Sequence, residues 1–300
     1  MKIRAPAKIN LALHVTGQRP DGYHLIESLV TFADVGDEIS IEPSDRDRLT
    51  FSGPFGGRLA ADFGTNLVIR ALDAIRTAAQ GRRCPPVAIH LEKNLPLASG
   101  IGGGSADAAA TLKGLNEFWG LGLGQAELMR IGLPLGADVP MCVCGKQLVA
   151  TGIGENIEQV SLPEMPMVLV NPGVAVSTPA IFRALVKKEN EALPVMSPFE
   201  MAISGQSTEG SGSVQKLASL SDKTCGLADY LRTTRNDLEA PAPSIQPVIG
   251  DAISTLEKSG ALFARMSGSG ATCFGIFADK AAAKSAKVSI GTSHPDWWIA

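Results

Sequence analysis

The sequence predicts an α+β fold with two domains, and three observations lead to this class. The chain has 300 residues, which is more than one domain of roughly 100–200 residues usually holds. Segments with strand-like alternation and segments with helical periodicity occur in both halves, and several strands precede and separate the helices instead of alternating strictly with them. A proline-containing linker at 160–166 separates the halves. We therefore expect domains at 1–162 and 163–300.

The first element is an alternating segment at residues 7–15, in which the odd-numbered positions from Ala7 to Val15 are all apolar. This period of two predicts a half-buried strand. Its second face begins with Lys8 and Asn10, so the sequence places a cation and an amide side by side on that face.

Helical periodicity predicts two helices in the first half, over 65–79 and 105–119, with Thr65 and Ser105 as their N-caps. Short apolar segments bounded by turn residues predict further strands in this half, at 37–42, 48–52 and 86–92.

The second half begins with a predicted strand at 167–170, followed by a helix with Ser177 as its cap and Pro179 in its first turn. The small, polar segment 204–213 predicts a mobile surface loop. Apolar periodicity and glycine-containing turns predict the remaining elements, which are a helix over 245–256, strands at 261–266 and 272–277, a helix at 279–287 and a strand near Trp297.

Composition excludes several classes of protein. The chain is 45% hydrophobic and 19% charged, which is typical of a globular protein with a full core. Its formal net charge of −3 argues against a nucleic-acid binder that neutralises phosphates. It has no run of 18 apolar residues, and Lys8 and Asn10 interrupt the first apolar stretch, so we expect neither a membrane span nor a signal peptide, and we expect a cytoplasmic location.

The metal-binding residue types are sparse. Five cysteines are present, and only Cys142 and Cys144 are close in sequence, so reduced thiols are a better interpretation than disulfides or a zinc site. Four histidines without a His-Glu-x-x-His motif argue against a transition-metal enzyme.

The most informative segment runs from Leu95 to Ser105 and lies between a predicted strand and a predicted helix. It holds four glycines, three of them consecutive at 102–104. Glycine lets the backbone approach a ligand closely, and free amides in front of a helix N-terminus bind phosphates. The spacing matches neither the Walker A motif nor the dinucleotide fingerprint. A flexible glycine-rich turn is the alternative, but the placement between strand and helix favours phosphate binding.

Three other segments are ambiguous when each is taken alone. Asp138, between a glycine and a proline, is suited to accept a proton, to hold a metal or to cap a helix. The segment 267–272 fits either a hairpin turn or a ligand contact. Tyr23 and His24 fit either base recognition or ordinary packing.

Taken together, these segments resemble the family of galactokinase, homoserine, mevalonate and phosphomevalonate kinases, the GHMP kinases. The three family motifs appear in order, as Pro6-Ala-Lys-Ile-Asn-Leu, as Pro96 to Ser105 and as Ser267-Gly-Ser-Gly270. The resemblance implies an N-terminal domain like domain 2 of ribosomal protein S5, a ferredoxin-like C-terminal domain and an active site in the cleft between them.

Within the family, the segments 17–24, 135–140 and 236–238 are most similar to a kinase whose small-molecule substrate is a cytidine diphosphate ester of a branched polyol, an isoprenoid precursor. The resemblance implies that ATP phosphorylates a hydroxyl of this ester, with Lys8 and Asp138 as catalytic residues. Mg²⁺ is expected as well, with ligands that the sequence leaves unknown.

The resemblance also implies the binding residues. Tyr23 and Phe182 would sandwich the cytosine ring, His24 would bind its polar edge, and Asn10 and Thr178 would lie near the polyol or the diphosphate. The residues expected to hold the ATP phosphates are Pro96, Leu97, Ala98, Ser99, Gly100, Ile101, Gly102, Gly103, Gly104, Ser105 and Ala106.

Two alternatives remain at this point, a family member acting on mevalonate or homoserine, and a non-catalytic nucleotide-binding protein. Ala106 departs from the family pattern, because many relatives carry a second serine there, and Ser105 alone would then supply a hydroxyl. We expect no nucleic-acid or membrane partner, and either a monomer or a homodimer.

Overall fold

The computed structural model describes residues 1–59, 66–194 and 220–300. The strands of its first sheet are β1 (Lys2–Gln18), β2 (His24–Pro43), β3 (Arg48–Ser52), β4 (Val87–Glu92), β5 (Leu148–Thr151) and β6 (Asn156–Gln159). Their order is β3–β4–β2–β5–β6, with β1 paired to β2 outside this path. The β3–β4 pair is parallel and the other pairs are antiparallel.

Helices cover this sheet with their apolar stripes turned inward, with α2 directly against β1 and β2 and α3 packed on the other helices. They are α1 (Leu67–Ala78), α2 (Gly103–Phe118), α3 (Gln125–Gly132) and α4 (Val139–Cys144), with 3₁₀ turns η1 (Gly56–Arg58) and η2 (Leu133–Leu135). Side chains of α1 and α2 such as Leu72 and Leu112 pack with Ile41 and Ile89 of the sheet to form one core.

The second sheet has the order β10–β7–β9–β8 and is antiparallel throughout. Its strands are β7 (Met167–Asn171), β8 (Phe263–Met266), β9 (Cys273–Ile276) and β10 (Trp298–Ile299). The helices of this half are α5 (Thr178–Arg183), α7 (Leu220–Arg232), α8 (Ala242–Ile245), α9 (Val248–Lys258) and α10 (Lys280–Ser293). The α+β class predicted from the sequence is therefore confirmed.

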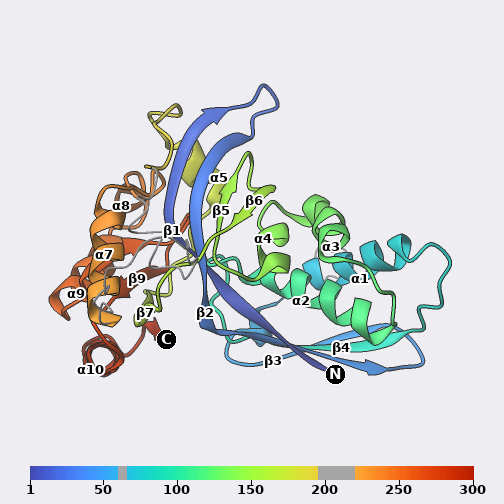
Figure 1. The fold of residues 1–300 in the computed structure, drawn as a ribbon. Helices are drawn as coiled ribbons and strands as arrows, with labels where there is room; N and C mark the ends of the chain where they lie inside the picture. The colour runs from blue at the N-terminus through green and yellow to red at the C-terminus, as the bar shows by residue number, and fades with distance from the viewer. Residues whose placement is uncertain (60–65, 195–219) are drawn as a thin grey trace, which may run out of the picture.

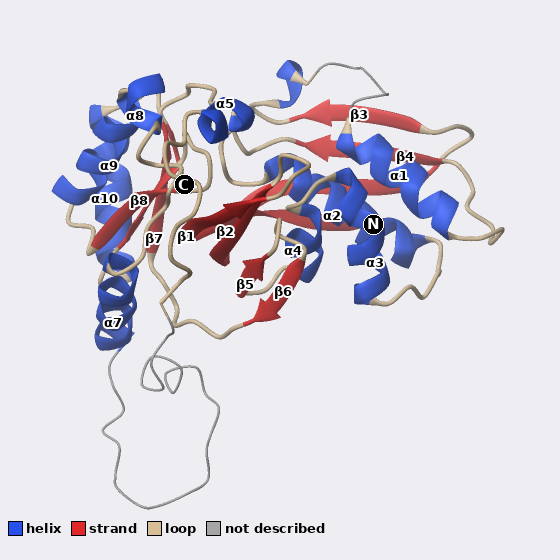
Figure 2. Ribbon diagram, turned by 90° about the horizontal axis from the view of Figure 1, so that it is seen from above, coloured by secondary structure: helices blue, strands red, loops and turns tan. Residues whose placement is uncertain are grey.

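The β1–β2 pair lies between the two groups of helices. Figure 1 shows α1 to α4 on one side of it and α7 to α10, with β7 and β9, on the other. The turned view in Figure 2 shows the same grouping, with β3 and β4 beside α1. Lys8 and Asn10 of β1 thus lie where the two halves of the molecule meet.

The expectation of a half-buried first strand is wrong. Every residue from Ala7 to Val15 is buried, including Lys8, Asn10 and His14 on the polar face. The apolar side chains from Ile9 to Val15 pack into cores that include residues of the second half, and on the other face the side chains of Lys8 and Asn10 are covered through contacts with Asp138 and Ser28. Alternation in the sequence shows which side chains share a face, but it does not show that other elements cover both faces.

Several local predictions need correction. Gly102, in the left-handed region at φ 65°, occupies the N-cap position of α2, so Ser105 lies in the first turn and is not its cap. The cap of α1 is Asn66, whose side chain accepts from the backbone N–H of Val68, and Thr65 lies outside the described residues. The predicted strands at 48–52 and 86–92 are confirmed, but β5, β6, α3, α4 and the first half of β2 were missed.

The predicted loop at 204–213 also lies outside the described residues. The division at 162 and 163 stays a prediction. The first sheet ends at Gln159 and the second begins at Met167, on either side of it. In the described part of the chain, none of the helices has the length and apolar character needed to cross a lipid bilayer.

Candidate active site

A cavity of about 1070 Å³ lies where the two halves meet. Its wall combines β1, the turn before β2, the glycine loop, the loop before α4, α5 and the loop after β8. Sixteen of the eighteen predicted site residues line it, and the two that do not are Ile101 and Ala106. Both of these side chains are buried in the cores, so only their backbones are available to a ligand.

The structure brings Lys8 and Asp138 together although they are 130 residues apart in sequence. The Lys8 Nζ lies 2.8 Å from Asp138 Oδ2 and 2.8 Å from Asn10 Oδ1. The Lys8 side chain is 4% exposed, whereas that of Asp138 is 37% exposed and faces the cavity. A buried ammonium needs such acceptors to offset its loss of hydration.

Asp138 stands at the N-cap position of α4, which was one alternative for its role. Within the described structure, its side chain makes no capping hydrogen bond and instead pairs with Lys8. The backbone of Gly136 and the ring of Pro140 position this turn, with Pro140 near the start of the helix, where a missing N–H costs little. The carboxylate is thus free for chemistry at the cavity.

The glycine loop approaches the loop at 267–270 so closely that side chains are excluded. A Cβ atom on Gly100 would lie 2.5 Å from both Gly270 N and Ser267 O, and Gly100 has a φ of +74°. Ser267 also joins β1 to the glycine loop, because its hydroxyl accepts from Asn10 N at 3.0 Å and donates to Gly100 O at 3.3 Å. The backbone amides at the start of α2 come directly after Gly100 and Ile101 in the chain, and such amides bind phosphate groups.

Beneath the loop, Lys93 lies between two buried carboxylates. Its Nζ is 2.6 Å from Asp37 Oδ2 and 2.5 Å from Asp107 Oδ2. The second oxygen of Asp37 accepts from the backbone N–H groups of Asn94 and Leu95, immediately before the glycine loop. This cluster, called here the Lys93 triad (Lys93, Asp37 and Asp107), ties β2, the end of β4 and α2 together.

Burial raises the pKa of Asp107 to about 7, because Lys93 offsets only part of the lost hydration and the charge of Asp37 adds to the effect. The Oδ1 atom of Asp107 has no hydrogen-bond partner in the residues that the structure describes. The triad was not predicted from the sequence. The available signal was a lysine at the end of an apolar strand, directly before the glycine loop.

At the other end of the cavity, aromatic side chains gather. The rings of His24 and Phe182 stack with centroids 4.7 Å apart and planes 26° from parallel. Tyr23 is 58% exposed. Burial lowers the pKa of His24, and the charge of Lys188 lowers it further, so the imidazole is neutral at pH 7. Thr178 also lies at this end, 2.8 Å from the hydroxyl of Ser269.

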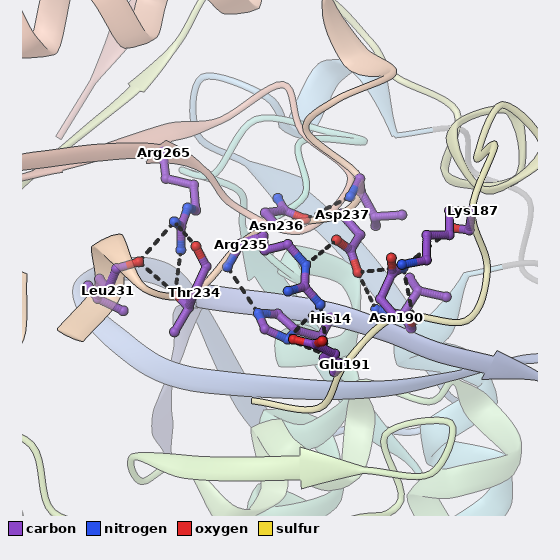
Figure 3. A network of polar contacts seen from close by, with 12 residues as sticks. His14, Lys187, Asn190, Glu191, Leu231, Thr234, Arg235, Asn236, Asp237 and Arg265 are labelled. Carbon is purple, nitrogen blue, oxygen red and sulfur yellow. Dashed lines mark hydrogen bonds and ion pairs between the residues drawn. The ribbon is translucent and has the colours of Figure 1, made fainter. Parts of the chain in front are cut away.

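A polar network holds the C-terminal part of β1 against residues 191 and 235–237, as Figure 3 shows. Arg235 N donates to His14 Nε2 at 3.0 Å, and Arg235 Nε donates to Asp237 Oδ1 at 2.8 Å. Asn236 donates to the carbonyls of Met266 and Gly268, at 2.8 Å each. The network therefore connects β1 with the loop after β8, and it accounts for the segment 236–238 that the sequence analysis singled out.

Comparisons with known proteins show the family of the chain. Residues 66–146 match the GHMP kinases N terminal domain, and residues 226–295 match the GHMP kinases C terminal domain. The chain belongs to the GHMP kinase family. It thus carries the fold of an ATP-dependent kinase.

Some individual relatives are about half identical to this chain in sequence. The 4-diphosphocytidyl-2-C-methyl-D-erythritol kinase of Agrobacterium fabrum strain C58 is 51% identical over 299 residues, covering 98% of this chain and 93% of the relative. The protein of the same name from Rhizobium johnstonii is 52% identical, covering 98% and 90%.

Solved structures of other proteins share the fold of this chain. A crystal structure of 4-(cytidine 5'-diphospho)-2C-methyl-D-erythritol kinase has a TM-score of 0.71 at 29% identity, covering 100% of this chain and 98% of that one. Homoserine kinase from Cytophaga hutchinsonii has a TM-score of 0.68 at 19% identity, covering 100% and 94%, and shares the fold.

Proposed function

We propose that this protein transfers the γ-phosphoryl group of ATP to the 2-hydroxyl of 4-diphosphocytidyl-2-C-methyl-D-erythritol, in the non-mevalonate synthesis of isoprenoid precursors. The observation that carries the proposal is the Lys8–Asp138 pair, 2.8 Å apart on the wall of a cavity that also contains a glycine loop in front of a helix. The names of the relatives support the choice of substrate.

In this reaction a bond forms between the acceptor oxygen and the γ-phosphorus, and the bond from that phosphorus to the β–γ bridging oxygen breaks, so ADP leaves. The transition state is loose, and catalysis comes mainly from positioning and electrostatic stabilisation. Asp138 accepts the proton of the hydroxyl, at the oxygen that does not face Lys8. The proton leaves late in such a transition state, so a weakly basic carboxylate is sufficient.

Lys8 holds Asp138 in place and stabilises the transferred group. Two of its three N–H groups are used by Asn10 and Asp138. The third has no acceptor in the residues described, and it is directed to the phosphoryl oxygens when substrates are bound. The backbone amides of the loop 96–106 and of the first turn of α2 hold the remaining ATP phosphates.

Mg²⁺ fits this site as a companion of the nucleotide. No group of three or more metal-binding side chains occurs in the described residues. Mg²⁺ in kinases needs only one or two protein oxygens, because phosphates and water supply the rest. Ser105 would hold it from the protein side, since its hydroxyl lies on the cavity wall and faces Gly136 in the loop that leads to Asp138. The ion would neutralise phosphate charge.

The cytidine end of the substrate occupies the aromatic end of the cavity. Phe182 and Tyr23 stack on the cytosine ring, and the neutral His24 hydrogen-bonds its polar edge. His24 Nε2 is buried and has no hydrogen-bond partner in the described structure, so a base that reaches it would satisfy an unpaired nitrogen. Asn10 and Thr178 also line the cavity, and the diphosphate and the polyol would contact them.

We also propose that the protein works in the cytoplasm, as a monomer or homodimer. All five cysteines are free thiols, as a reducing compartment requires. Burial raises the pKa of Cys142 to about 12, so this thiol is inert even though it lies near Asp138.

The test is a phosphoryl-transfer assay in which ATP is offered with the cytidine diphosphate ester, mevalonate and homoserine in parallel. We expect phosphorylation of the cytidine ester alone. Asp138→Asn should lower kcat by about 10²–10⁴-fold, because the proton acceptor is lost, while ATP affinity changes little. Asp251→Asn, on the exposed side of α9, is the matched control. Transfer to another acceptor, or full activity of Asp138→Asn, would refute the proposal.

A further inference from the structure

A buried hydroxyl on β2 determines which way the amide of Asn10 points. The Oγ of Ser28 lies 2.7 Å from Ala12 O and 2.7 Å from Asn10 Nδ2. Ser28 is fully buried and does not reach the cavity wall, so it contacts no substrate. It stands beside the irregularity in the β1–β2 ladder between Asn10 and Ala12.

The direction of each hydrogen bond follows from chemistry. A backbone carbonyl has no hydrogen to give, so the Ser28 hydroxyl must donate to Ala12 O. The serine oxygen is then an acceptor, and the Asn10 group that faces it must be the NH₂ group. The carbonyl oxygen Oδ1 of Asn10 is therefore turned towards Lys8, whose ammonium can only donate.

The opposite orientation of the amide would be costly at this position. It would place an NH₂ group against the Lys8 ammonium and leave Lys8 with Asp138 as its one acceptor. Asn10 is 1% exposed and Lys8 is 4% exposed, so water could not replace the missing hydrogen bond. The backbone of Asn10 is held separately, by its N–H bond to Ser267, so the side-chain amide is the group that Ser28 controls.

We infer that Ser28 is a positioning residue for phosphoryl transfer, acting through Asn10 to fix the ammonium of Lys8 beside Asp138. The inference rests on the proposed function for the identity of the acceptor substrate and not for the direction of the hydrogen bonds. A small displacement of a catalytic group is enough to slow a positioned reaction by about 10²-fold. Ser28 therefore affects turnover without touching a substrate.

The decisive experiment is a double-variant cycle with whichever acceptor the wild-type protein phosphorylates. Ser28→Ala should lower kcat roughly tenfold to hundredfold and leave the KM for ATP and for the acceptor near wild type. Because Ser28 acts through Asn10, the double variant Ser28→Ala/Asn10→Ala should have the same kcat as Asn10→Ala alone. Independent, multiplicative losses, or wild-type kcat in Ser28→Ala, would overturn the inference.

Two further variants separate positioning from a general loss of stability. Ser28→Thr keeps the hydroxyl on a strand that suits threonine, and should retain activity. Ser28→Cys keeps a weak donor and acceptor, and should fall between Thr and Ala. Equal kcat values for all three would contradict the inference, even if Ser28→Ala folds poorly.

A readout that does not depend on turnover distinguishes this inference from the proposed function. In NMR spectra, the side-chain amide protons of Asn10 are identified by their loss in Asn10→Ala. They should exchange slowly with water in the wild type and in Ser28→Thr, and faster in Ser28→Ala. Unchanged exchange would overturn the role of Ser28. A wild-type protein that ignores the cytidine ester would refute only the proposed substrate.

Discussion

At Lys8, a single ammonium group is held nearly out of water by two different oxygens, the carboxylate of Asp138 and the amide of Asn10. Such burial is tolerated because both oxygens are oriented before a substrate arrives. Asn10 is fixed by Ser28 and Ser267, and Lys8 N donates to Ile101 O at 3.0 Å in the glycine loop. The pair is thus preorganised, and a charge that develops nearby meets dipoles that need no reorganisation.

Phe182 is the residue whose replacement separates substrate binding from turnover. Phe182→Ala removes the ring face that the cytosine would stack on, which contributes about 1–3 kcal/mol in comparable systems. The KM for the cytidine ester should therefore rise roughly tenfold to hundredfold, with kcat and the KM for ATP nearly unchanged. Initial rates with each substrate varied in turn measure this.

Phe182→Tyr keeps an aromatic face at the same position and serves as the control, with a KM close to wild type. His24 stacks on Phe182 in the described structure, so loss of the ring also frees His24. If Phe182→Ala binds the cytidine ester as tightly as the wild type, the aromatic end of the cavity does not hold the base.

At the scale of elements, the glycine loop depends on what lies beneath it. The Lys93 triad holds both ends of the loop, with Asp37 bonded to the backbone before it and Asp107 in the helix after it. A Cβ atom on Gly103 would lie 3.1 Å from Lys93 Nζ, so the ammonium sits directly against the first turn of α2. The position of the loop is therefore set by charges in the core as well as by its glycines.

Lys93→Met should lower the stability of the protein, because the charges beneath the loop would no longer balance. The variant leaves two carboxylates buried without a cation, and breaking a buried pair in this way costs about 3–5 kcal/mol in the free energy of unfolding. Urea denaturation measures the loss. Lys2→Met removes an exposed lysine paired with Glu38 and should change little, which makes it the control.

The double variant Lys93→Met/Asp107→Asn provides a second check on the triad. It removes one of the two uncompensated charges and should recover part of the stability that Lys93→Met loses. A double variant no more stable than Lys93→Met would show that the carboxylate of Asp107 is not what the lysine compensates.

These elements also show what sequence reasoning can and cannot reach. The glycine loop, β3 and β4 were predicted because their signals are local, in glycines, turns and alternation. Asp37, Lys93 and Ser28 were missed because their partners lie outside their own segments, 56 residues apart for Asp37 and Lys93 and 18 residues apart for Ser28 and Asn10. Asp138 was ambiguous for the same reason, and the family resemblance supplied what its own segment could not.

At the scale of the whole molecule, β1 belongs to both halves. Ile9 and Leu11 pack in a core with Leu169 and Phe274 of the second sheet. Leu13 joins a different core that is built mainly from the second half. A boundary at 162 and 163 therefore divides the sequence more cleanly than it divides the packing, and Lys8, the proposed catalytic residue, lies on the strand that both halves share.

The two halves should consequently unfold together. Separating them would expose the apolar side chains of β1 that pack in cores shared with the second half, so each half would lose part of its core. The three tryptophans permit the measurement, because Trp119 lies in the first half and Trp297 and Trp298 lie in the second. In Trp119→Phe the fluorescence reports on the second half, and in Trp297→Phe/Trp298→Phe it reports on the first.

Within each variant, urea transitions followed by fluorescence and by circular dichroism should coincide, and the first half should never unfold separately from the second. Two distinct midpoints would mean that the packing of β1 against the second sheet contributes too little to couple the domains, and the Lys8–Asp138 geometry would then have to survive on the first domain alone.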